Sequence, residues 1–486
     1  MCRIPAANVP AGADTDESLT TVRILEGDNS DPSIVRCGSE YYLVHSSFVY
    51  TPGLVVYRSA NLTDWTPCSV ALTEFTGDVW APDITVVDGR FYIYFPTLGE
   101  HGKTSMVTWA DSPEGPWSKP VDLHVDGIDP EHVLAEDGRR YLLMSSGDMY
   151  PLSADGCSVT GEPFNVYKGW EIPEEYDIES ISMEGLNVRK AGEYYYLFAA
   201  EGGTAGPPTS HMVVEARSKS ATGPWENAPF NPLLRTRSRT ERWWSKGHGS
   251  VVDTPDGRLF MVFHAYENGH QTLGRQTLLR ELELKDGWLR LKEGGISLPA
   301  PARRKVSGAS DFVWQTCREH SFGERFAVSG DTLRLRAKGK SPAEGSPLLA
   351  RTSAHRYEVE ACVRLKSPEA SAGLVAYYDE RYHFGFGFDA GGMLRYRRGQ
   401  VSRAQSKCPE ANREGKMWLR MRNDNDVLTA WYSADGQEWH KFPWGFDISG
   451  VHHNTVYGFL FVRPGIYAGG QGDVEVTGFK LTDLDL

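Results

Sequence analysis

The feature that most constrains the fold is a hairpin pattern that recurs five times in the first three hundred residues. Each copy has a polar leading residue, a β-branched or apolar run, a turn that contains Gly, and a second apolar or aromatic run. The copies begin at Asp31, Asp83, Asp129, Glu184 and His248. Successive copies start between 46 residues (129−83) and 64 residues (248−184) apart. This spacing is typical of the blades of a β-propeller.

A second hairpin follows three of the copies. The segments "VVYRSANLTDW" (55–65), "MVTWADSPEGPW" (106–117) and "MVVEARSKSATGPW" (212–225) each read as a strand, a polar turn and a Trp that starts another strand. Two hairpins make a four-stranded blade, so we expect an all-β, five-bladed β-propeller over residues 20–300. The alternative, a pair of β-sandwiches with accidental similarity, does not explain why the copies recur in order and in register.

A second domain is expected after a linker. The segment "SLPAPARRKVSGAS" (297–310) is rich in Pro, Ala and Arg and has no strand periodicity. Alternating segments return over 311–486, for example "AGLVAYYDERYHFGFGF" (372–388), and predict a C-terminal β-sandwich of jelly-roll or lectin type. This domain is either a brace that lends a loop to the rim of a pocket or a sugar-binding module.

The leading residues of the five copies are the first functional signal. The first strand of a propeller blade lines the central channel, so the five leading positions are expected to converge on the axis. They would bring four carboxylates and one imidazole together, which costs stability through repulsion and desolvation. Such a concentration indicates chemistry rather than a requirement of the fold.

Charge and cysteine usage exclude several classes of function. The formal net charge is −13, so the chain lacks the basic footprint that nucleic acid or an anionic membrane requires. The seven cysteines include no C-x-x-C pair, and we interpret them as reduced thiols of a cytoplasmic protein. The first twenty residues lack an apolar signal-peptide core, and no segment is apolar enough to span a membrane.

At the level of motifs, residues 24–300 resemble glycoside hydrolase family 43 in its two-domain form. The motifs that carry the resemblance occur in the order of that family: "DPSIVRCGSEYYLVHSSFVYTPGL" from Asp31, "WAPDI" (80–84), "IDPEHVLAEDGRRYLL" (128–143), "MEGLNVRKAGEYYYLFAAEGGT" (183–204), "GHGSVVDTPDG" (247–257) and "TLGRQTLL" (272–279). Leu186 stands where the family commonly has Pro, and this departure leaves the acid of the motif unchanged.

The resemblance implies hydrolysis with inversion at the anomeric carbon, and it assigns roles to three carboxylates. Asp31 matches the general base that activates water, Asp129 the carboxylate that orients the acid and raises its pKa, and Glu184 the general acid. Inversion by this chemistry requires the two working carboxyl groups to lie about 6.5–9.5 Å apart. Simpler interpretations remain open: Asp-Pro pairs favour turns, and a glutamate can be a solvated strand end.

Further residues are assigned to the sugar pocket. Arg275 matches an arginine that reaches into the sugar subsite, and Phe48 and Trp80 match its apolar walls. Asp83 is expected in a structural or subsite role. His248 matches an axial histidine that in some members lies near a water-bound calcium. The alternatives are an ion-pair arginine, core aromatics and a core histidine.

We therefore expect an exo-acting glycosidase that releases pentose units from plant polysaccharide fragments, β-xylosidase first and α-L-arabinofuranosidase second. Galactan-, galactofuranose- or arabinan-directed hydrolysis and a non-catalytic carbohydrate-binding propeller are the alternatives. The intact Asp31, Asp129 and Glu184 set disfavours the last. No cofactor is expected to be required, although calcium near the axis is possible, and the partner is an oligosaccharide with a possible homo-oligomer.

Overall fold

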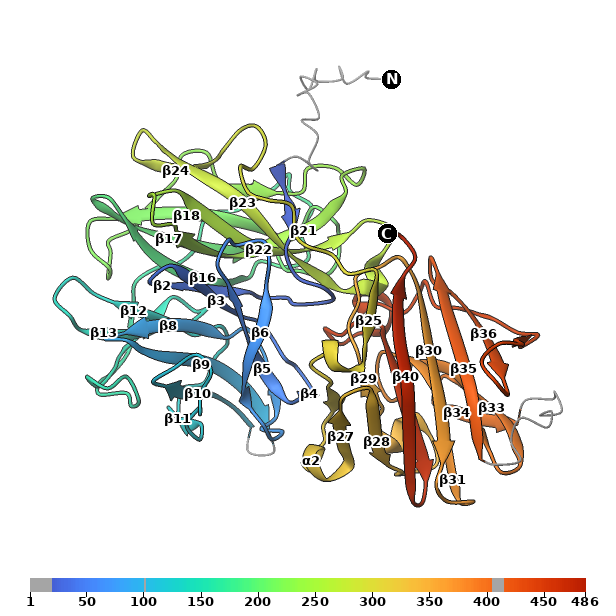
Figure 1. Cartoon of the computed structure of the whole chain (residues 1–486). Coiled ribbons are helices and arrows are strands. Elements are labelled where there is room, and N and C mark those ends of the chain that lie inside the picture. The colour runs from blue at the N-terminus through green and yellow to red at the C-terminus, as the bar shows by residue number, and fades with distance from the viewer. Residues whose placement is uncertain (1–19, 100–101, 404–414) are drawn as a thin grey trace, which may run out of the picture.

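The fold was examined in a computed structural model, which describes residues 20–99, 102–403 and 415–486. Two β-rich bodies lie side by side, with the N-terminal one in blue to yellow-green and the C-terminal one in yellow to red (Figure 1). The N-terminal body contains five separate antiparallel sheets. The five-bladed β-propeller predicted from the hairpin repeats is therefore confirmed.

Each blade is built from consecutive strands of the chain. Blade one contains β2 (Ser33–Cys37), β3 (Glu40–Val44), β5 (Gly53–Ser59) and β6 (Thr66–Leu72). Blade two contains β7 (Asp78–Val79), β8 (Asp83–Val87), β9 (Arg90–Gly99), β10 (Gly102–Ala110) and β11 (Val121–Asp122). Blade three contains β12 (Glu131–Leu134), β13 (Arg140–Leu143), β14 (Asp148–Pro151) and β15 (Phe164–Asn165).

The last two blades follow the same plan. Blade four contains β16 (Met183–Ala191), β17 (Tyr194–Glu201), β18 (Met212–Ser218), β19 (Glu226–Asn227) and β20 (Leu234–Arg235). Blade five contains β21 (Trp243–Asp253), β22 (Leu259–Glu267), β23 (Arg275–Lys285), β24 (Trp288–Leu291) and, from the start of the described chain, β1 (Val22–Arg23). Because β1 pairs with β23, the first strand completes the last blade and closes the propeller.

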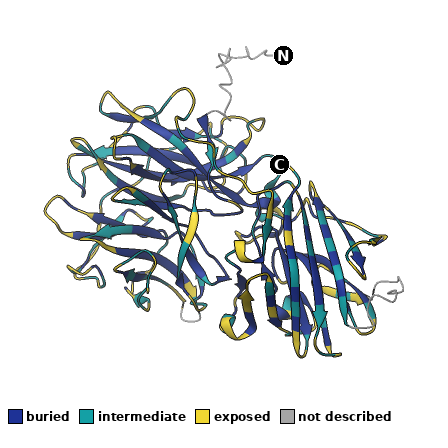
Figure 2. Cartoon of the chain, in the orientation of Figure 1, coloured by how far each residue is buried: buried dark blue, intermediate teal, exposed yellow. Residues whose placement is uncertain are grey.

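Local sequence explains the hairpins and how they pack. The first hairpin of every blade turns at a glycine with positive φ, a conformation that other residues adopt at a cost: Gly38, Gly89, Gly138, Gly192 and Gly257. Apolar side chains of neighbouring blades form a separate buried cluster at each of the five blade interfaces. Burial is concentrated between the blades and inside the C-terminal body, while turns are exposed (Figure 2).

The C-terminal body is a β-sandwich, as predicted. Its larger sheet contains β25 (Val306–Gly308), β27 (Phe326–Ser329), β28 (Thr332–Arg336), β30 (Arg356–Leu365), β35 (Lys416–Asp424), β36 (Val427–Ser433), β37 (His440–Lys441), β38 (Phe446–Asp447) and β40 (Asp473–Asp483). The facing sheet contains β29 (Leu348–Leu349), β31 (Ala370–Tyr377), β32 (His383–Asp389), β33 (Gly392–Arg397), β34 (Gln400–Arg403) and β39 (Arg463–Gly470). Short helical turns connect elements: η1 (Gln271–Leu273), η2 (Ala309–Asp311), α2 (Phe322–Arg325), α3 (Pro342–Gly345) and α4 (His453–Val456).

The two bodies are joined by strand pairing as well as by side chains. β4 (Tyr50–Thr51) of the propeller pairs with β26 (Thr316–Cys317) from the sandwich side. The Gln315 side chain donates a hydrogen bond to the Pro52 carbonyl at 2.6 Å. The sandwich is therefore fastened to the part of blade one that precedes β5, close to Phe48.

Two further predictions from the sequence concern the cysteines and membrane-spanning segments. The cysteines at 37, 68, 157, 317 and 362 are free thiols, while Cys2 and Cys408 lie outside the described residues. Within the described ranges, none of the helices has the length and apolar character needed to cross a membrane.

Candidate active site

The residues at the heads of the inner strands share an unusual backbone conformation. Asp31, Asp129 and His248 each have φ 55°, and Gly185 has φ 56°. Each of these four residues stands two positions before a residue of the inner strand that faces the axis. They are therefore structural equivalents: Asp31 in blade one, Asp129 in blade three, Gly185 in blade four and His248 in blade five. The sequence predicted Glu184 as the counterpart of Asp31 in blade four. This prediction was wrong by one residue, because Gly185 is the counterpart.

The equivalence was also wrong, by two residues, in blade two. Asp83 is the first residue of β8, as Ser33 is of β2, so Ala81 occupies the place that corresponds to Asp31. The Asp83 carboxylate accepts hydrogen bonds from the Ser33 hydroxyl at 2.8 Å and from the His132 backbone nitrogen at 3.0 Å. A sugar contact by Asp83 remains a prediction, because protein groups bond both of its oxygens.

Asp83 belongs to a closed ring of side chains one layer below the leading residues. In each of the five blades, one inner-strand side chain accepts a hydrogen bond from a backbone nitrogen of the next blade. The acceptors, which we call the axial ring, are Ser33, Asp83, Glu131, Asn187 and Ser250. The last bond runs from the Ile34 nitrogen to Ser250 and closes the circle across 216 positions of sequence. The ring fixes the blades to one another directly beneath the catalytic candidates.

Asp31 is built to remain ionised. Arg275 donates from Nη1 to Oδ1 at 2.9 Å, and the Ser46 hydroxyl donates to Oδ2 at 2.5 Å. His264 Nδ1 lies 3.1 Å from Oδ1. Burial opposes ionisation, but Arg275 and the neighbouring imidazoles outweigh it and hold the pKa of Asp31 well below its usual range. Asp31 is therefore a carboxylate at neutral pH, as a general base must be.

Glu184 has the opposite character. Burial, followed by the negative charge of Asp31, raises the pKa of the Glu184 carboxyl to about 7. Its side chain is 24% exposed, so it can still meet a substrate. A carboxyl group that retains its proton near neutrality next to one that does not is the arrangement expected for a general acid and a general base.

Asp129 is placed to control the orientation of Glu184. Its Oδ2 accepts a hydrogen bond from the Gly185 nitrogen at 2.8 Å, which fixes the backbone immediately after the acid. Burial, and then Glu184 and Asp31, raise the pKa of Asp129 well above its usual range. Glu184 thereby opposes ionisation of Asp129. The predicted influence in the other direction, a pKa of Glu184 raised by Asp129, stays a prediction, because the groups that raise the Glu184 pKa are, after burial, Asp31 and Glu179.

Glycine is required at position 185 by a close approach as well as by its φ. A Cβ atom there would lie 2.7 Å from His248 Nδ1. That Nδ1 also lies 3.7 Å from Asp31 Oδ1. His248 is therefore close both to the backbone next to the acid and to the side chain of the base.

The apolar wall of the site comes from both domains. Phe48 is buried and lies against Phe459 of the sandwich, with ring centroids 6.4 Å apart and planes 17° apart. The Arg275 guanidinium carbon lies 5.7 Å from the Phe48 centroid and 4.9 Å from the Phe459 centroid. Trp80 is half-buried and packs against the same cluster as Phe48. The predicted Phe48 and Arg275 therefore lie together, and the loop from the C-terminal domain adds Phe459. Trp80 follows Val79, whose backbone pairs with that of Phe48.

Sequence reasoning missed Ser46, His211, His264 and Phe459. His264 lies in the middle of β22, and Phe459 lies about two hundred residues beyond the propeller repeats, where no pattern marks either one. His211 lies seven residues after the end of the "MEGLNVRKAGEYYYLFAAEGGT" motif of the fourth copy (211−204), and this proximity was an available signal.

The histidines bear on the calcium that the family resemblance suggested. Among the described residues, no group of three or more His, Cys, Asp or Glu side chains is arranged to hold a metal ion. Calcium takes six to eight oxygen ligands, whereas His248 is a single imidazole that stacks on His264 with centroids 5.8 Å apart. The described side chains do not fit a directly ligated calcium, and a water-mediated role of His248 remains a prediction.

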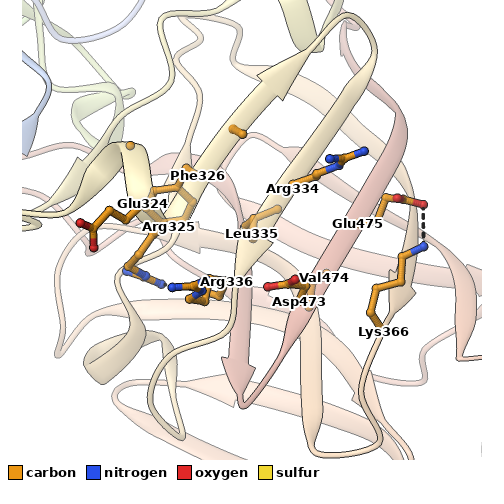
Figure 3. Close-up of a pocket in the computed structure, with 12 residues that line it drawn as sticks. Glu324, Arg325, Phe326, Arg334, Leu335, Arg336, Lys366, Asp473, Val474 and Glu475 are labelled. Carbon is orange, nitrogen blue, oxygen red and sulfur yellow. Dashed lines mark hydrogen bonds and ion pairs between the residues drawn. The ribbon is translucent and has the colours of Figure 1, made fainter.

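A separate hollow lies on the sandwich (Figure 3). It is formed by α2, β27, β28 and β40, and Lys366 Nζ pairs with Glu475 at 3.1 Å at its edge. Its one lining aromatic, Phe326, is buried. The described lining thus offers paired charges and no exposed ring on which a sugar could stack, so sugar binding by the C-terminal domain remains a prediction.

The contribution of the sandwich to the pocket can be measured by replacing Phe459 with Ala. Phe459 is 38% exposed and forms wall rather than core, so we expect KM to rise and kcat/KM to fall about tenfold, with the melting temperature nearly unchanged. Tyr457→Ala is the matched control, because Tyr457 is 78% exposed in the same loop. Equal kinetics for F459A and Y457A would show that Phe459 does not contact substrate.

Each of the two domains matches a known protein-family model. The family model described as glycosyl hydrolases family 43 matches residues 21–289. A second model, described as the beta xylosidase C-terminal concanavalin A-like domain, matches residues 307–478. The order of the two matches is that of the propeller and the sandwich.

Characterised relatives and solved structures agree with these matches. The chain is 32% identical to a xylan 1,3-beta-xylosidase of Vibrio sp, over 75% of this chain and 78% of the relative. It is 29% identical to a non-reducing end alpha-L-arabinofuranosidase of Bacteroides ovatus, over 93% and 92% of the two chains. A family 43 protein of Bacillus licheniformis has a similar structure, with a TM-score of 0.83 and 25% identity over 95% of this chain and all of the other.

Proposed function

Because the chain belongs to glycosyl hydrolases family 43, we propose that it is an exo-acting, anomer-inverting glycosidase that releases pentose units from oligosaccharides derived from plant polysaccharides. β-Xylosidase activity is proposed first and α-L-arabinofuranosidase activity second. The observation that carries the proposal is the opposite protonation of two carboxyl groups at one axis: Asp31 ionised beside Arg275, and Glu184 with its pKa raised to about 7.

The proposed reaction is a single displacement. Asp31 accepts a proton from a water molecule as the oxygen of that water attacks the anomeric carbon. Glu184 donates its proton to the glycosidic oxygen as the bond to the leaving sugar breaks. Arg275 holds Asp31 in its ionised form, and the rings of Phe48 and Phe459 exclude water from the other side of the guanidinium.

The choice of sugar is supported by the relatives rather than by the carboxylates. The Vibrio and Bacteroides relatives carry names that specify a xylosidase and an arabinofuranosidase, and they match most of this chain. The C-terminal match to a domain described from beta xylosidases supports xylose first. The loop that places Phe459 beside Phe48 narrows the site from one side, which favours removal of a terminal unit over cleavage within a chain.

The proposal also includes the setting of the reaction. We propose that catalysis needs no cofactor and that the protein acts in the cytoplasm, in keeping with the free thiols of the described cysteines. The net charge of −13 suits a neutral oligosaccharide partner better than a polyanion.

A panel of defined xylo-, arabino- and galacto-oligosaccharides tests the substrate. We expect monomeric pentose from the first minutes of reaction, and proton NMR should show the first-formed anomer opposite to that of the substrate. Retention of configuration would refute single displacement. Release of galactose alone would favour the galactan-directed alternative, internal cleavage of arabinan an endo-acting enzyme, and no hydrolysis of any substrate a non-catalytic binding propeller.

A further inference from the structure

One buried histidine next to the catalytic acid has no partner. The His211 side chain is completely buried, and neither ring nitrogen has a hydrogen-bond partner among the described residues. Leaving a buried polar group unsatisfied is destabilising, so such a group in a native protein calls for an explanation. The proposed reaction as described so far makes no use of it.

Neighbours on two sides of His211 restrict its ring. One face stacks on His264, with centroids 5.3 Å apart and planes 9° apart. Its edge lies against Gly247, where a Cβ atom would come within 1.7 Å of His211 Cδ2. Nε2 lies 3.8 Å from Glu184 Oε1. Packing on two sides restricts rotation of the ring, and Glu184 is an acidic group within 4 Å of its Nε2.

The distance of 3.8 Å between His211 Nε2 and Glu184 Oε1 is slightly longer than a hydrogen bond. Of the two side chains, that of Glu184 has more room to move. Glu184 is 24% exposed, whereas His211 is held on two sides. Hydrogen bonds of catalytic groups are often long without substrate and shorten in the reacting complex. A movement of the Glu184 carboxyl by less than about 1 Å would bring Oε1 within reach of Nε2.

We propose that His211 is a positioning residue for the general acid, donating a hydrogen bond from Nε2 to Glu184 Oε1 in the reacting complex. The other carboxyl oxygen then carries the proton towards the glycosidic oxygen. As the O–H bond of Glu184 breaks and the O–H bond of the leaving sugar forms, negative charge develops on the carboxylate. A hydrogen bond to a carboxylate is stronger than one to a neutral carboxyl, so the Nε2–H bond stabilises the transition state more than the ground state.

The electrostatic surroundings suit a neutral donor. Burial, and then His264, His248 and Arg275, lower the pKa of His211 well below its usual range. A neutral imidazole carries one N–H, and it can stabilise a developing carboxylate without competing with Glu184 for the catalytic proton.

The inference rests on the proposed function and is tested by leaving-group dependence. His211→Phe keeps a flat ring and removes both nitrogens. We expect kcat/KM for an unactivated disaccharide to fall about 10- to 100-fold, the range for loss of a hydrogen bond to a charged group. The 2,4-dinitrophenyl glycoside of the same sugar, which needs little acid assistance, should change less than about threefold. His211→Gln, which returns an N–H near the position of Nε2, should recover most of the loss.

His383→Phe is the matched control. His383 is also completely buried, stacks on Tyr377 with centroids 5.8 Å apart and has an unpartnered Nε2, but it lies in the sandwich. We expect H383F to keep the leaving-group dependence of the unaltered enzyme.

The positioning role of His211 would be overturned by equal losses on both substrates in H211F, or by an H211Q variant that is no more active than H211F. If H211F does not fold, His211→Leu, which also removes both nitrogens, takes its place: a loss confined to the unactivated disaccharide supports the inference, and equal losses on both substrates, or no loss on either, contradict it. Failure of the unaltered protein to hydrolyse any glycoside would instead contradict the proposed function.

Discussion

Replacing Glu184 with Ala is expected to lower kcat/KM for a xylo- or arabino-oligosaccharide by about 10²–10⁴-fold, the usual contribution of a general acid. The same variant should hydrolyse an activated aryl glycoside at a rate much closer to that of the unaltered protein, because a good leaving group departs without a proton. Steady-state rates on the two substrates measure the difference. Equal losses on both would show that Glu184 is not the acid.

The pH profile provides an independent check on Glu184. Its pKa is raised to about 7, so the acid form is lost as the pH rises through that value and kcat/KM should fall on the alkaline side. Arg275 holds the pKa of Asp31 well below its usual range, so the acid limb should lie below the pH at which an ordinary aspartate titrates. E184A should flatten the alkaline limb for activated substrates.

A control is needed because a second buried glutamate titrates in the same range. Burial raises the pKa of Glu201 to about 7, but its Oε1 accepts a hydrogen bond from the Trp170 nitrogen at 2.7 Å and it has no place in the proposed reaction. Glu201→Gln should therefore retain the alkaline limb. If E201Q lost the alkaline limb, the fall in kcat/KM near pH 7 would have to be assigned to Glu201 and not to Glu184.

Removal of the base is expected to have an effect of similar size. Asp31→Ala should lower kcat by about 10²–10⁴-fold on both activated and unactivated substrates, because attack by water needs the base whatever the leaving group. Azide is a nucleophile that needs no deprotonation and can occupy the space left by the carboxylate. Added azide should restore turnover of an activated glycoside and yield a glycosyl azide whose anomeric configuration is opposite to that of the substrate.

The azide experiment separates chemistry from damage to the fold. Removing Asp31 leaves Arg275 buried without its carboxylate, so some loss of melting temperature is expected. Asp31→Asn retains the shape of the side chain and leaves little room for azide. It should therefore be as inactive as D31A without azide, and added azide should restore less of its activity. A product of retained configuration, or no response of D31A to azide in a folded protein, would contradict the role of Asp31.

Local features of the chain were predictable from sequence, and small shifts in register between blades were not predicted. The repeats predicted the propeller because each hairpin is local: a glycine turn and two apolar strands are written in about fifteen consecutive residues. The same repeats misassigned the equivalents of Asp31 in blades two and four. Asp83 stands two residues further along its blade, a shift that the alignment of Pro82 with Pro32 and Pro130 could have shown. Glu184 stands one residue earlier, and the positive φ of Gly185, matching that of Asp31, reveals this shift.

The number and order of the blades, the sandwich that follows them, and the presence of Asp31, Asp129 and Glu184 at strand heads can all be predicted from the amino-acid sequence. Which groups meet at those strand heads depends on the folded molecule. Arg275 reaches Asp31 across 244 positions of sequence, and Phe459 comes from the other domain. The physical reason is that hairpin turns and strand patterns depend on neighbouring residues, whereas charge stabilisation, burial and stacking depend on contacts made only when the propeller closes on itself and the sandwich packs against it.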